Sequence, residues 1–359
     1  MNDQNNRKKR ICMVVPAPEV KGGIASVVNG YRGSRLEQDY EIIYVESYRD
    51  GGKLAKLFKG IGAYITFLGV MLIHRPDAVH IHSSFGPSYY RKLPFIYMSG
   101  WFQVPVINHI HGADFEEFYM QAEGGKQNHI KKIYGKCTRL IALSEEWKER
   151  LSLLVPQEKI VVLKNYSVLQ EKLIPHPCHN QILFMGALEE RKGCFDIPEV
   201  LNRVLEKVPH CTLCMAGDGH PAVVAYIKNE FSPKVLDEHV FFPGWVRGEV
   251  KDKYLRYSDL FFLPSYQEGM PMAILDAMGY GLPIVSTDVG GISEIVHEGE
   301  NGYLCKPGDT QAMADRIAAL LTDEKTRQAA GEKSRQIIQA DYTLEAHLTQ
   351  LEKLYQEIV

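Results

Sequence analysis

The most informative part of the chain is PSYQEGMPMAILDAMGYGLPIVSTDVGGISEIV, residues 264–296. An apolar run of strand length, LFFL, precedes it, and a second, PIVS, lies within it. Between the two runs, Gly269 permits a tight turn and Pro271 suits the first turn of a helix. Strand, loop, helix and strand in this order are typical of a parallel sheet with crossover helices. The segment therefore predicts an α/β fold.

The same alternation extends over most of the chain. Short apolar runs recur at strand length, and the segments between them are long enough for crossover helices. In the first half the runs are ICMVVP, EIIYVES, AVHIHSS, VPVINHIHG and RLIALS; in the second they are QILFMGAL, CTLCMAG, VFFPGW, LFFLPS and PIVSTD. Helices are expected near Ile24, over 196–207 and over 271–279. Each half thus has the pattern of a Rossmann-like, doubly wound domain.

A break separates the halves at residues 165–180, where prolines occur and no period is visible. We interpret this segment as a linker between an N-terminal domain, 1–167, and a C-terminal domain, 168–342. Apolar residues recur at helical spacing over 343–359, so a final amphipathic helix is expected, packed back toward the N-terminal domain.

The bulk composition excludes several classes of protein. With 359 residues, 45% of them hydrophobic and 24% charged, the chain can bury two cores. Its seven cysteines form no disulfide-like framework, and Cys211 and Cys214 have C-x-x-C spacing only inside an apolar strand pattern. The first ten residues, MNDQNNRKKR, lead into an apolar run too short for a signal peptide. We therefore expect a cytoplasmic protein in a reducing compartment.

Charge is distributed unevenly. Residues 1–167 carry 23 Lys and Arg against 16 Asp and Glu, a net charge of +7, and the remainder carries 18 against 28, a net charge of −10; together they give the overall −3. Either the two halves meet different partners or this is ordinary surface variation.

Residues 53–73 contain one helical stripe of large apolar side chains, with Lys53, Lys56 and Lys59 beside it. Its members are Leu54, Leu57, Phe58, Ile61, Ile65, Leu68 and Leu72. The favoured interpretation is a crossover helix whose stripe packs in the core. The alternative is docking on the surface of a membrane, where the lysines meet anionic lipid.

Three loops carry groups that suit a phosphorylated ligand. The helix expected after Pro271 offers free backbone N–H groups to phosphate oxygens, whereas the nearby carboxylates of Glu268 and Asp276 suit sugar hydroxyl groups. Arg191 and Lys192, in MGALEERKGCFD, can neutralise a diphosphate. Lys21, Gly22 and Gly23 form a glycine loop that leads into a helix, another common phosphate site.

Residues 268–294 resemble the donor-binding signature of the retaining glycosyltransferases of family 4, which have the GT-B architecture. The family pattern is Glu-Gly, variable residues, Leu, Glu-Ala-Met, then G-x-P-V-V and G-G. Here it reads EGMP, then LDAM, GLPIV and GG. The resemblance implies two Rossmann-like domains facing across a cleft, the first on the acceptor side and the second binding a nucleotide sugar.

The resemblance also implies roles for individual residues. Glu268 contacts the donor sugar, position 276 the ribose, and Lys192 the diphosphate. Two positions depart from the family pattern: Asp276 replaces Glu, and Ala187 replaces an Arg for which Arg191 is a weak substitute. The remaining donor-binding candidates are Gly22, Gly23, Gly217, Gly244, Gly269, Met270, Pro271 and Met272.

Histidines cluster in the first half as His80, His82, His109 and His111. Alternation puts each pair on one face of a sheet, so a zinc site must be considered, but no fourth ligand accompanies them. By resemblance His111 lies beside the donor sugar and His82 is a weaker acceptor-side candidate. His80 and His109 fit buried, hydrogen-bonded imidazoles better.

Asp114 lies just beyond this cluster. It could face the acceptor hydroxyl or cap a helix over 115–119.

The main hypothesis is a retaining glycosyltransferase that moves a hexose or N-acetylhexosamine from a nucleotide diphosphate sugar, with UDP favoured. The acceptor would be a glycan or polyprenyl-linked molecule in surface-polysaccharide synthesis. No metal, other cofactor or nucleic acid is expected, and an anionic membrane surface is a candidate partner. The alternatives are a GT-B-shaped sugar-nucleotide epimerase or hydrolase and a non-catalytic sugar-nucleotide-binding protein.

Overall fold

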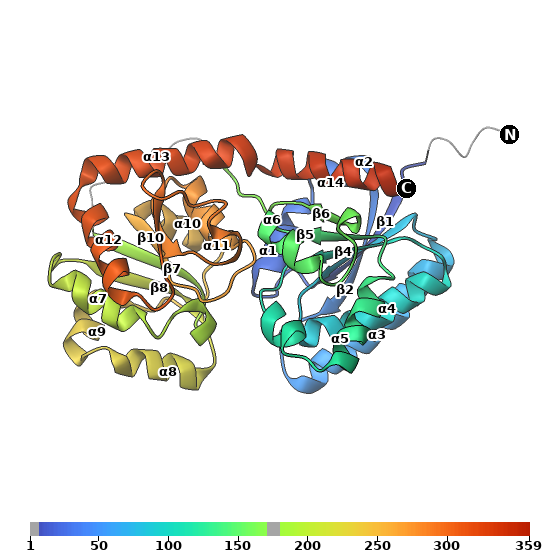
Figure 1. Cartoon of the computed structure of the whole chain (residues 1–359), viewed down its shortest axis with the longest axis horizontal. Coiled ribbons are helices and arrows are strands. Elements are labelled where there is room, and N and C mark those ends of the chain that lie inside the picture. The colour runs from blue at the N-terminus through green and yellow to red at the C-terminus, as the bar shows by residue number, and fades with distance from the viewer. Residues whose placement is uncertain (1–6, 171–179) are drawn as a thin grey trace. The chain divides into compact units, whose positions relative to one another are not determined.

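The computed structural model describes residues 7–170 and 180–359, and the chain divides into two compact units. Unit 1 comprises Met1–Asn165 and Leu344–Val359, and unit 2 comprises Tyr166–Thr343. Most of the expected linker, residues 171–179, lies outside the described residues. Each unit holds one six-stranded parallel sheet, so the predicted α/β class with two sheets is confirmed (Figure 1).

The sheet of unit 1 has the strand order β2-β1-β3-β4-β5-β6. Its strands are β1 (Arg10–Pro16), β2 (Glu41–Tyr48), β3 (Ala78–Ser83), β4 (Val106–Ile110), β5 (Arg139–Ala142) and β6 (Ile160–Val162). The helices of the unit are α1 (Gly23–Tyr31), α2 (Arg35–Asp39), α3 (Lys53–Ile73), α4 (Pro87–Trp101), α5 (Gly124–Tyr134), α6 (Glu145–Leu151) and α14 (Leu344–Ile358), with short turns η1 (Glu116–Met120) and η2 (Gln157–Lys159).

Strand β3 shows how the two faces of this sheet are used. Val79 and Ile81 belong to the apolar core that also holds Phe67 of α3 and Phe95 of α4. Because side chains alternate along a strand, the histidines of β3 face the other way, and His80 hydrogen-bonds Tyr355 of α14. The C-terminal helix therefore covers the histidine face of the unit 1 sheet.

The sheet of unit 2 has the order β12-β11-β10-β7-β8-β9. Its strands are β7 (Gln181–Ala187), β8 (Thr212–Asp218), β9 (Val240–Phe241), β10 (Leu260–Leu263), β11 (Ile284–Thr287) and β12 (Gly302–Cys305). The helices are α7 (Ile197–Leu205), α8 (Pro221–Glu230), α9 (Pro233–His239), α10 (Gly248–Tyr257), α11 (Met272–Gly279), α12 (Thr310–Thr322) and α13 (Glu324–Asp341), with turns η3 (Glu190–Lys192) and η4 (Gly290–Ile292).

The structure corrects the interpretation of the apolar stripe on α3. The core face of this helix carries Ala63, Phe67, Val70 and Met71. The seven stripe residues lie on the opposite face, and their exposed fractions range from 40% for Leu68 to 70% for Leu54. The expectation that the stripe packs in the core is therefore wrong, because this helix is apolar on both faces and periodicity cannot tell which face is buried.

A second correction concerns Gly193, which was expected to begin a helix. It instead ends the turn η3 with φ +70°, and α7 begins at Ile197. A Cβ on Gly193 would lie 1.9 Å from the carbonyl oxygen of Pro264, at the end of β10. Glycine is needed here both for the left-handed backbone and for the close approach of the two loops.

Replacing this glycine is expected to destabilise unit 2. Gly193→Ala should lower the free energy of unfolding by roughly 2–4 kcal/mol, because backbone strain and a clash with Pro264 coincide. The matched control is Gly248→Ala, which has φ +53° but nothing within 4 Å of its added Cβ. It should cost only about 1 kcal/mol. Urea denaturation of both variants checks this, and equal losses would contradict it.

Candidate active site

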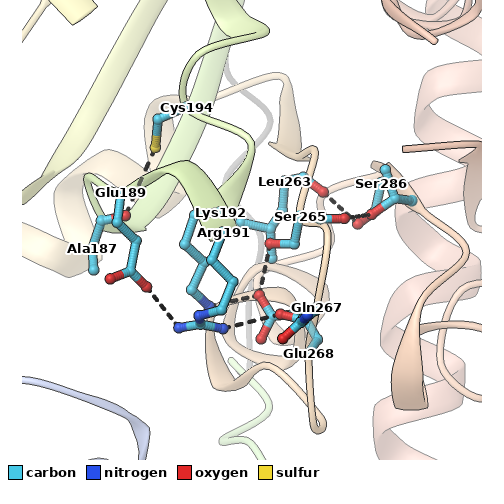
Figure 2. Close-up of polar contacts among 11 residues, drawn as sticks. Ala187, Glu189, Arg191, Lys192, Cys194, Leu263, Ser265, Gln267, Glu268 and Ser286 are labelled. Carbon is cyan, nitrogen blue, oxygen red and sulfur yellow. Dashed lines mark hydrogen bonds and ion pairs between the residues drawn. The ribbon is translucent and has the colours of Figure 1, made fainter. Parts of the chain in front are cut away.

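The centre of the candidate site in unit 2 is an ion pair between Lys192 and Glu268 (Figure 2). Lys192 Nζ donates to Glu268 Oε1 over 2.6 Å, and Ser265 Oγ donates to the same oxygen over 2.7 Å. Glu268 is only 6% exposed. Lys192 comes from η3 after β7, and Glu268 from the loop after β10. Adjacent parallel strands therefore bring the two predicted groups together at their carboxyl ends, where α/β sheets bind ligands.

Arg191 reaches the same loop but is held by other partners. Its guanidinium donates to the backbone oxygen of Gln267 over 3.0 Å and pairs with Glu189 over 2.6 Å (Figure 2). Its own carbonyl accepts from the N–H of Tyr266. Arg191 thus ties η3 to the Glu268 loop and acts in this structure as a positioning group. Ala187, at the position of the family arginine, lies at the end of β7.

Helix α11 begins directly beyond Glu268. Gly269 and Met270 are buried, Pro271 is the N-cap, and Met272 is the first helical residue. The first N–H groups of a helix lack partners within the helix, so this end suits an anion.

Asp276, on the second turn of α11, lies in a polar cluster. Lys251 Nζ of α10 donates to Asp276 Oδ2 over 2.6 Å, and Ser167 Oγ donates to Oδ1 over 3.4 Å. The Asp276 side chain keeps 19% exposure. An ion pair this close orients the carboxylate without hiding it, so Asp276 can accept further hydrogen bonds from hydroxyl groups.

The candidate glycines of unit 2 differ in what they require. A Cβ on Gly217 would lie 2.0 Å from the Gly186 carbonyl oxygen, so this glycine is needed where β8 passes β7. Gly244 has φ +75° in open space, so only its backbone conformation favours glycine. Gly290 would meet the Glu268 carbonyl oxygen at 2.0 Å, and the N–H of Gly291 donates to the Gly269 oxygen over 2.7 Å. The diglycine after β11 therefore shapes the Glu268 loop.

The candidates of unit 1 include a stack of four histidines. Ring centroids are 4.4 Å apart for His80 and His82 and 4.0 Å apart for His109 and His111. His82 Nδ1 and His111 Nε2 are 3.0 Å apart and share a hydrogen bond. His82 is buried and His111 partly exposed, so His82 reaches a ligand only through His111. His80 has the expected hydrogen bond, but neither nitrogen of His109 has a partner among the described residues, contrary to expectation.

Burial keeps these imidazoles neutral. It lowers the pKa of His111 and of His80 to about 3 and depresses the pKa of His82 and His109 well below the usual value, with neighbouring histidines adding to the effect. At neutral pH, His111 therefore offers one N–H and one lone pair rather than a charge.

Ligand nitrogens of His80, His82 and His109 lie within 4.8 Å of one another, close enough to consider a metal ion. Coordination requires lone pairs, which lie in the ring planes, to converge on one point. The rings of His80 and His109 are nearly parallel, at 9°, so their lone pairs do not converge.

The other candidates of unit 1 lie in loops. Gly22, with φ +129°, precedes α1, and Gly23 is its first residue; the Lys21 N–H donates to Asp50 Oδ2. Asp114 is partly exposed before the π-helical turn η1, and its backbone oxygen accepts from the Phe118 N–H.

Sequence reasoning missed Lys251 and Ser265, the partners of the two key carboxylates. Lys251 is one of several lysines and arginines on a polar helix, and nothing in its neighbourhood marks it. Ser265 stands three residues before Glu268, a spacing that could have suggested a local hydrogen bond.

Two family models match the chain, and together they cover most of it. Residues 25–166 match Glycosyltransferase Family 4, and residues 169–337 match Glycosyl transferases group 1. The boundary between the two matches falls at the boundary between the two units.

Curated relatives have related names. N-acetyl-alpha-D-glucosaminyl L-malate synthase of Bacillus anthracis is 30% identical over 50% of this chain and 45% of its own length, so the match spans less than half of that relative. The putative teichuronic acid biosynthesis glycosyltransferase TuaC of Bacillus subtilis is 23% identical over 97% of this chain and 90% of its own. An Escherichia coli UDP-Gal:alpha-D-GlcNAc-diphosphoundecaprenol alpha-1,3-galactosyltransferase is 26% identical over 84% and 81%.

Solved structures share the fold. Sucrose-phosphate synthase from Thermosynechococcus elongatus superposes with a TM-score of 0.79 at 17% identity, covering 98% of this chain and 99% of its own. HepE of Anabaena, solved in complex with UDP-glucose, gives 0.73 at 18% identity over 97% and 99%. The fold and the family matches define a glycosyltransferase with the GT-B fold. The chain belongs to glycosyltransferase family 4, as its resemblance to that family indicated.

Proposed function

We propose that this enzyme transfers a hexose or N-acetylhexosamine from a UDP-sugar to a glycan or lipid-linked acceptor in surface-polysaccharide synthesis, with retention at the anomeric carbon. The observation that carries the proposal is the Lys192–Glu268 pair beside the N-terminus of α11. UDP as the nucleotide is supported by the UDP-dependent galactosyltransferase among the relatives and by HepE. The role in polysaccharide synthesis is supported by the name of the teichuronic acid relative.

In the proposed mechanism, Lys192 and the free N–H groups of α11 stabilise the departing diphosphate. An ammonium group has three donors, so Lys192 can bind a phosphate oxygen while it keeps its bond to Glu268. Glu268 accepts hydrogen bonds from the donor sugar and Asp276 from the ribose. Gly22, Gly23 and His111 of unit 1 remain candidates for donor contacts, and Asp114 and His82 for the acceptor side.

Metal independence and a cytoplasmic location belong to the same proposal. Lys192 supplies the positive charge that a divalent cation would otherwise provide, so transfer is expected to continue in EDTA. The six cysteines that the structure describes are all free, which suits a reducing compartment.

A thermal-shift panel tests the nucleotide. UDP at 100 times its Kd should stabilise the protein by about 2.7 kcal/mol, while uridine, which lacks the diphosphate, should shift the transition little. GDP, ADP and CMP serve as matched nucleotides, and UDP-glucose, UDP-galactose and UDP-N-acetylglucosamine then report the sugar. Stabilisation by another nucleotide in place of UDP would contradict the assignment of the base, and rapid turnover of a UDP-sugar without acceptor would favour a hydrolase.

A further inference from the structure

The outer face of α3 is an apolar surface that nothing in the described chain covers. Seven large apolar residues occupy it at helical spacing, and Phe58 and Ile65 are each 69% exposed. Soluble proteins rarely expose contiguous apolar patches of this extent unless the patch meets a partner or a membrane.

Helix α4 continues this surface. Tyr64 and Phe67 of α3 stack against Phe95 of α4, so the two helices pack side by side (Figure 1). Tyr90, Tyr97 and Trp101 recur on α4 at helical spacing, and Trp101 is 76% exposed. Tyrosine and tryptophan combine an apolar ring with a polar tip, which suits the interface between lipid and water. We call these ten residues, the seven of α3 and the three of α4, the α3–α4 face.

The charge around this face is almost entirely positive. Residues 51–113 contain six lysines and arginines and a single acid, Asp77, which is bonded to Arg7 and to the N–H of Arg10. Lys53 and Lys56 are exposed at the start of α3. On the far side of α4, Lys136 lies 5.5 Å from the ring of Tyr97. Apolar residues rimmed by cations complement an anionic lipid surface better than they complement water or a basic partner.

Helix α3 is long and apolar enough to cross a membrane, judged by length and composition alone. Its neighbours in the chain argue for a different orientation. The strands before and after it, β2 and β3, both pair in parallel with β1. A spanning helix would separate these strands across the bilayer and would bury Phe67 and Met71 outside their core.

We propose that the α3–α4 face docks on an anionic lipid bilayer, with α3 parallel to the membrane surface. The apolar stripe enters the boundary between headgroups and acyl chains, and Lys53 and Lys56 extend toward the lipid phosphates.

Flotation of the full-length protein with vesicles tests this proposal. Wild type should float with phosphatidylglycerol–phosphatidylcholine vesicles and much less with pure phosphatidylcholine. Phe58→Glu/Ile65→Glu should weaken binding at least 100-fold, since it places two charges where apolar groups enter the lipid. The matched control is Leu153→Glu/Tyr226→Glu, which changes the charge equally at positions 47% and 48% exposed elsewhere. It should bind like wild type.

A second variant separates the electrostatic contribution. Lys53→Gln/Lys56→Gln should lower affinity for the anionic vesicles by about 30-fold and leave the weak binding to neutral vesicles unchanged. Wild-type protein that stays unbound at millimolar anionic lipid would overturn the proposal. So would a stable dimer in sedimentation velocity that Phe58→Glu/Ile65→Glu dissociates, because the face would then join two copies. The assay contains no sugar nucleotide, so its failure would leave the proposed transferase activity untouched.

Discussion

Glu268→Gln is expected to lower kcat/KM for sugar transfer by about 100- to 1,000-fold. The substitution keeps the size of the side chain but removes the charge that Lys192 and Ser265 hold in place. The effect should appear mainly in kcat, since the carboxylate would stabilise the donor sugar as charge develops on it. The matched control is Glu199→Gln, an exposed carboxylate of α7 that pairs with Arg203, and it should retain activity within about threefold.

Lys192→Ala should cause a loss of similar size, and the double variant should lose little more than either single one. Residues that act as a unit are strongly non-additive, and these two groups share a hydrogen bond of 2.6 Å. Additive losses would mean that the two residues act independently. A Glu268→Gln enzyme that is folded by circular dichroism and fully active would refute a catalytic role for this carboxylate.

Acid is expected to unfold unit 1 before unit 2. Five buried or partly buried histidines of unit 1 have a lowered pKa, including His347, whose pKa burial lowers to about 4. Their usual pKa is about 6.5, so between about pH 4 and 6.5 the unfolded chain binds more protons than the folded one. Stability is therefore complete above pH 6.5 and is lost as the pH falls. Five protons would give a slope of at most about 7 kcal/mol per pH unit.

Hydrogen exchange measured by mass spectrometry can follow the two units separately. Peptides from β3 and β4 should lose protection between pH 6.5 and 5, while peptides from β7 and β10 should keep it. His347→Gln should reduce the slope by about one proton, because His347 is one of the five. His297→Gln is the control, since His297 is an exposed histidine of unit 2. Equal acid sensitivity in both units would contradict this explanation.

Most of the fold was predictable because its strands are continuous apolar runs between polar turns. The strands that were missed lack this signal: β6 contains three residues, and β12 reads GYLC. The orientation of α3 could not be read from its sequence, because apolar residues occupy both its core face and its exposed stripe.

The candidate site was predictable where the groups follow strand ends, as Lys192 and Glu268 do. The pairing of Asp276 with Lys251 depends on how α10 packs against α11, and no local pattern encodes a contact across 25 positions. The same holds for His80 and Tyr355, which are 275 positions apart in the chain. Long-range polar partners of this kind depend on the tertiary fold.

The central claim is that a nucleotide diphosphate binds beside Lys192 at the start of α11. Calorimetric titration of UDP into the full-length wild type, Lys192→Ala and Glu268→Gln tests it most directly. The account predicts that Lys192→Ala weakens UDP binding by about 100-fold, because a charge-assisted hydrogen bond to phosphate is lost. Glu268→Gln should bind UDP within about threefold of wild type, since UDP lacks the sugar that Glu268 contacts. Wild-type affinity for UDP in Lys192→Ala would contradict the account.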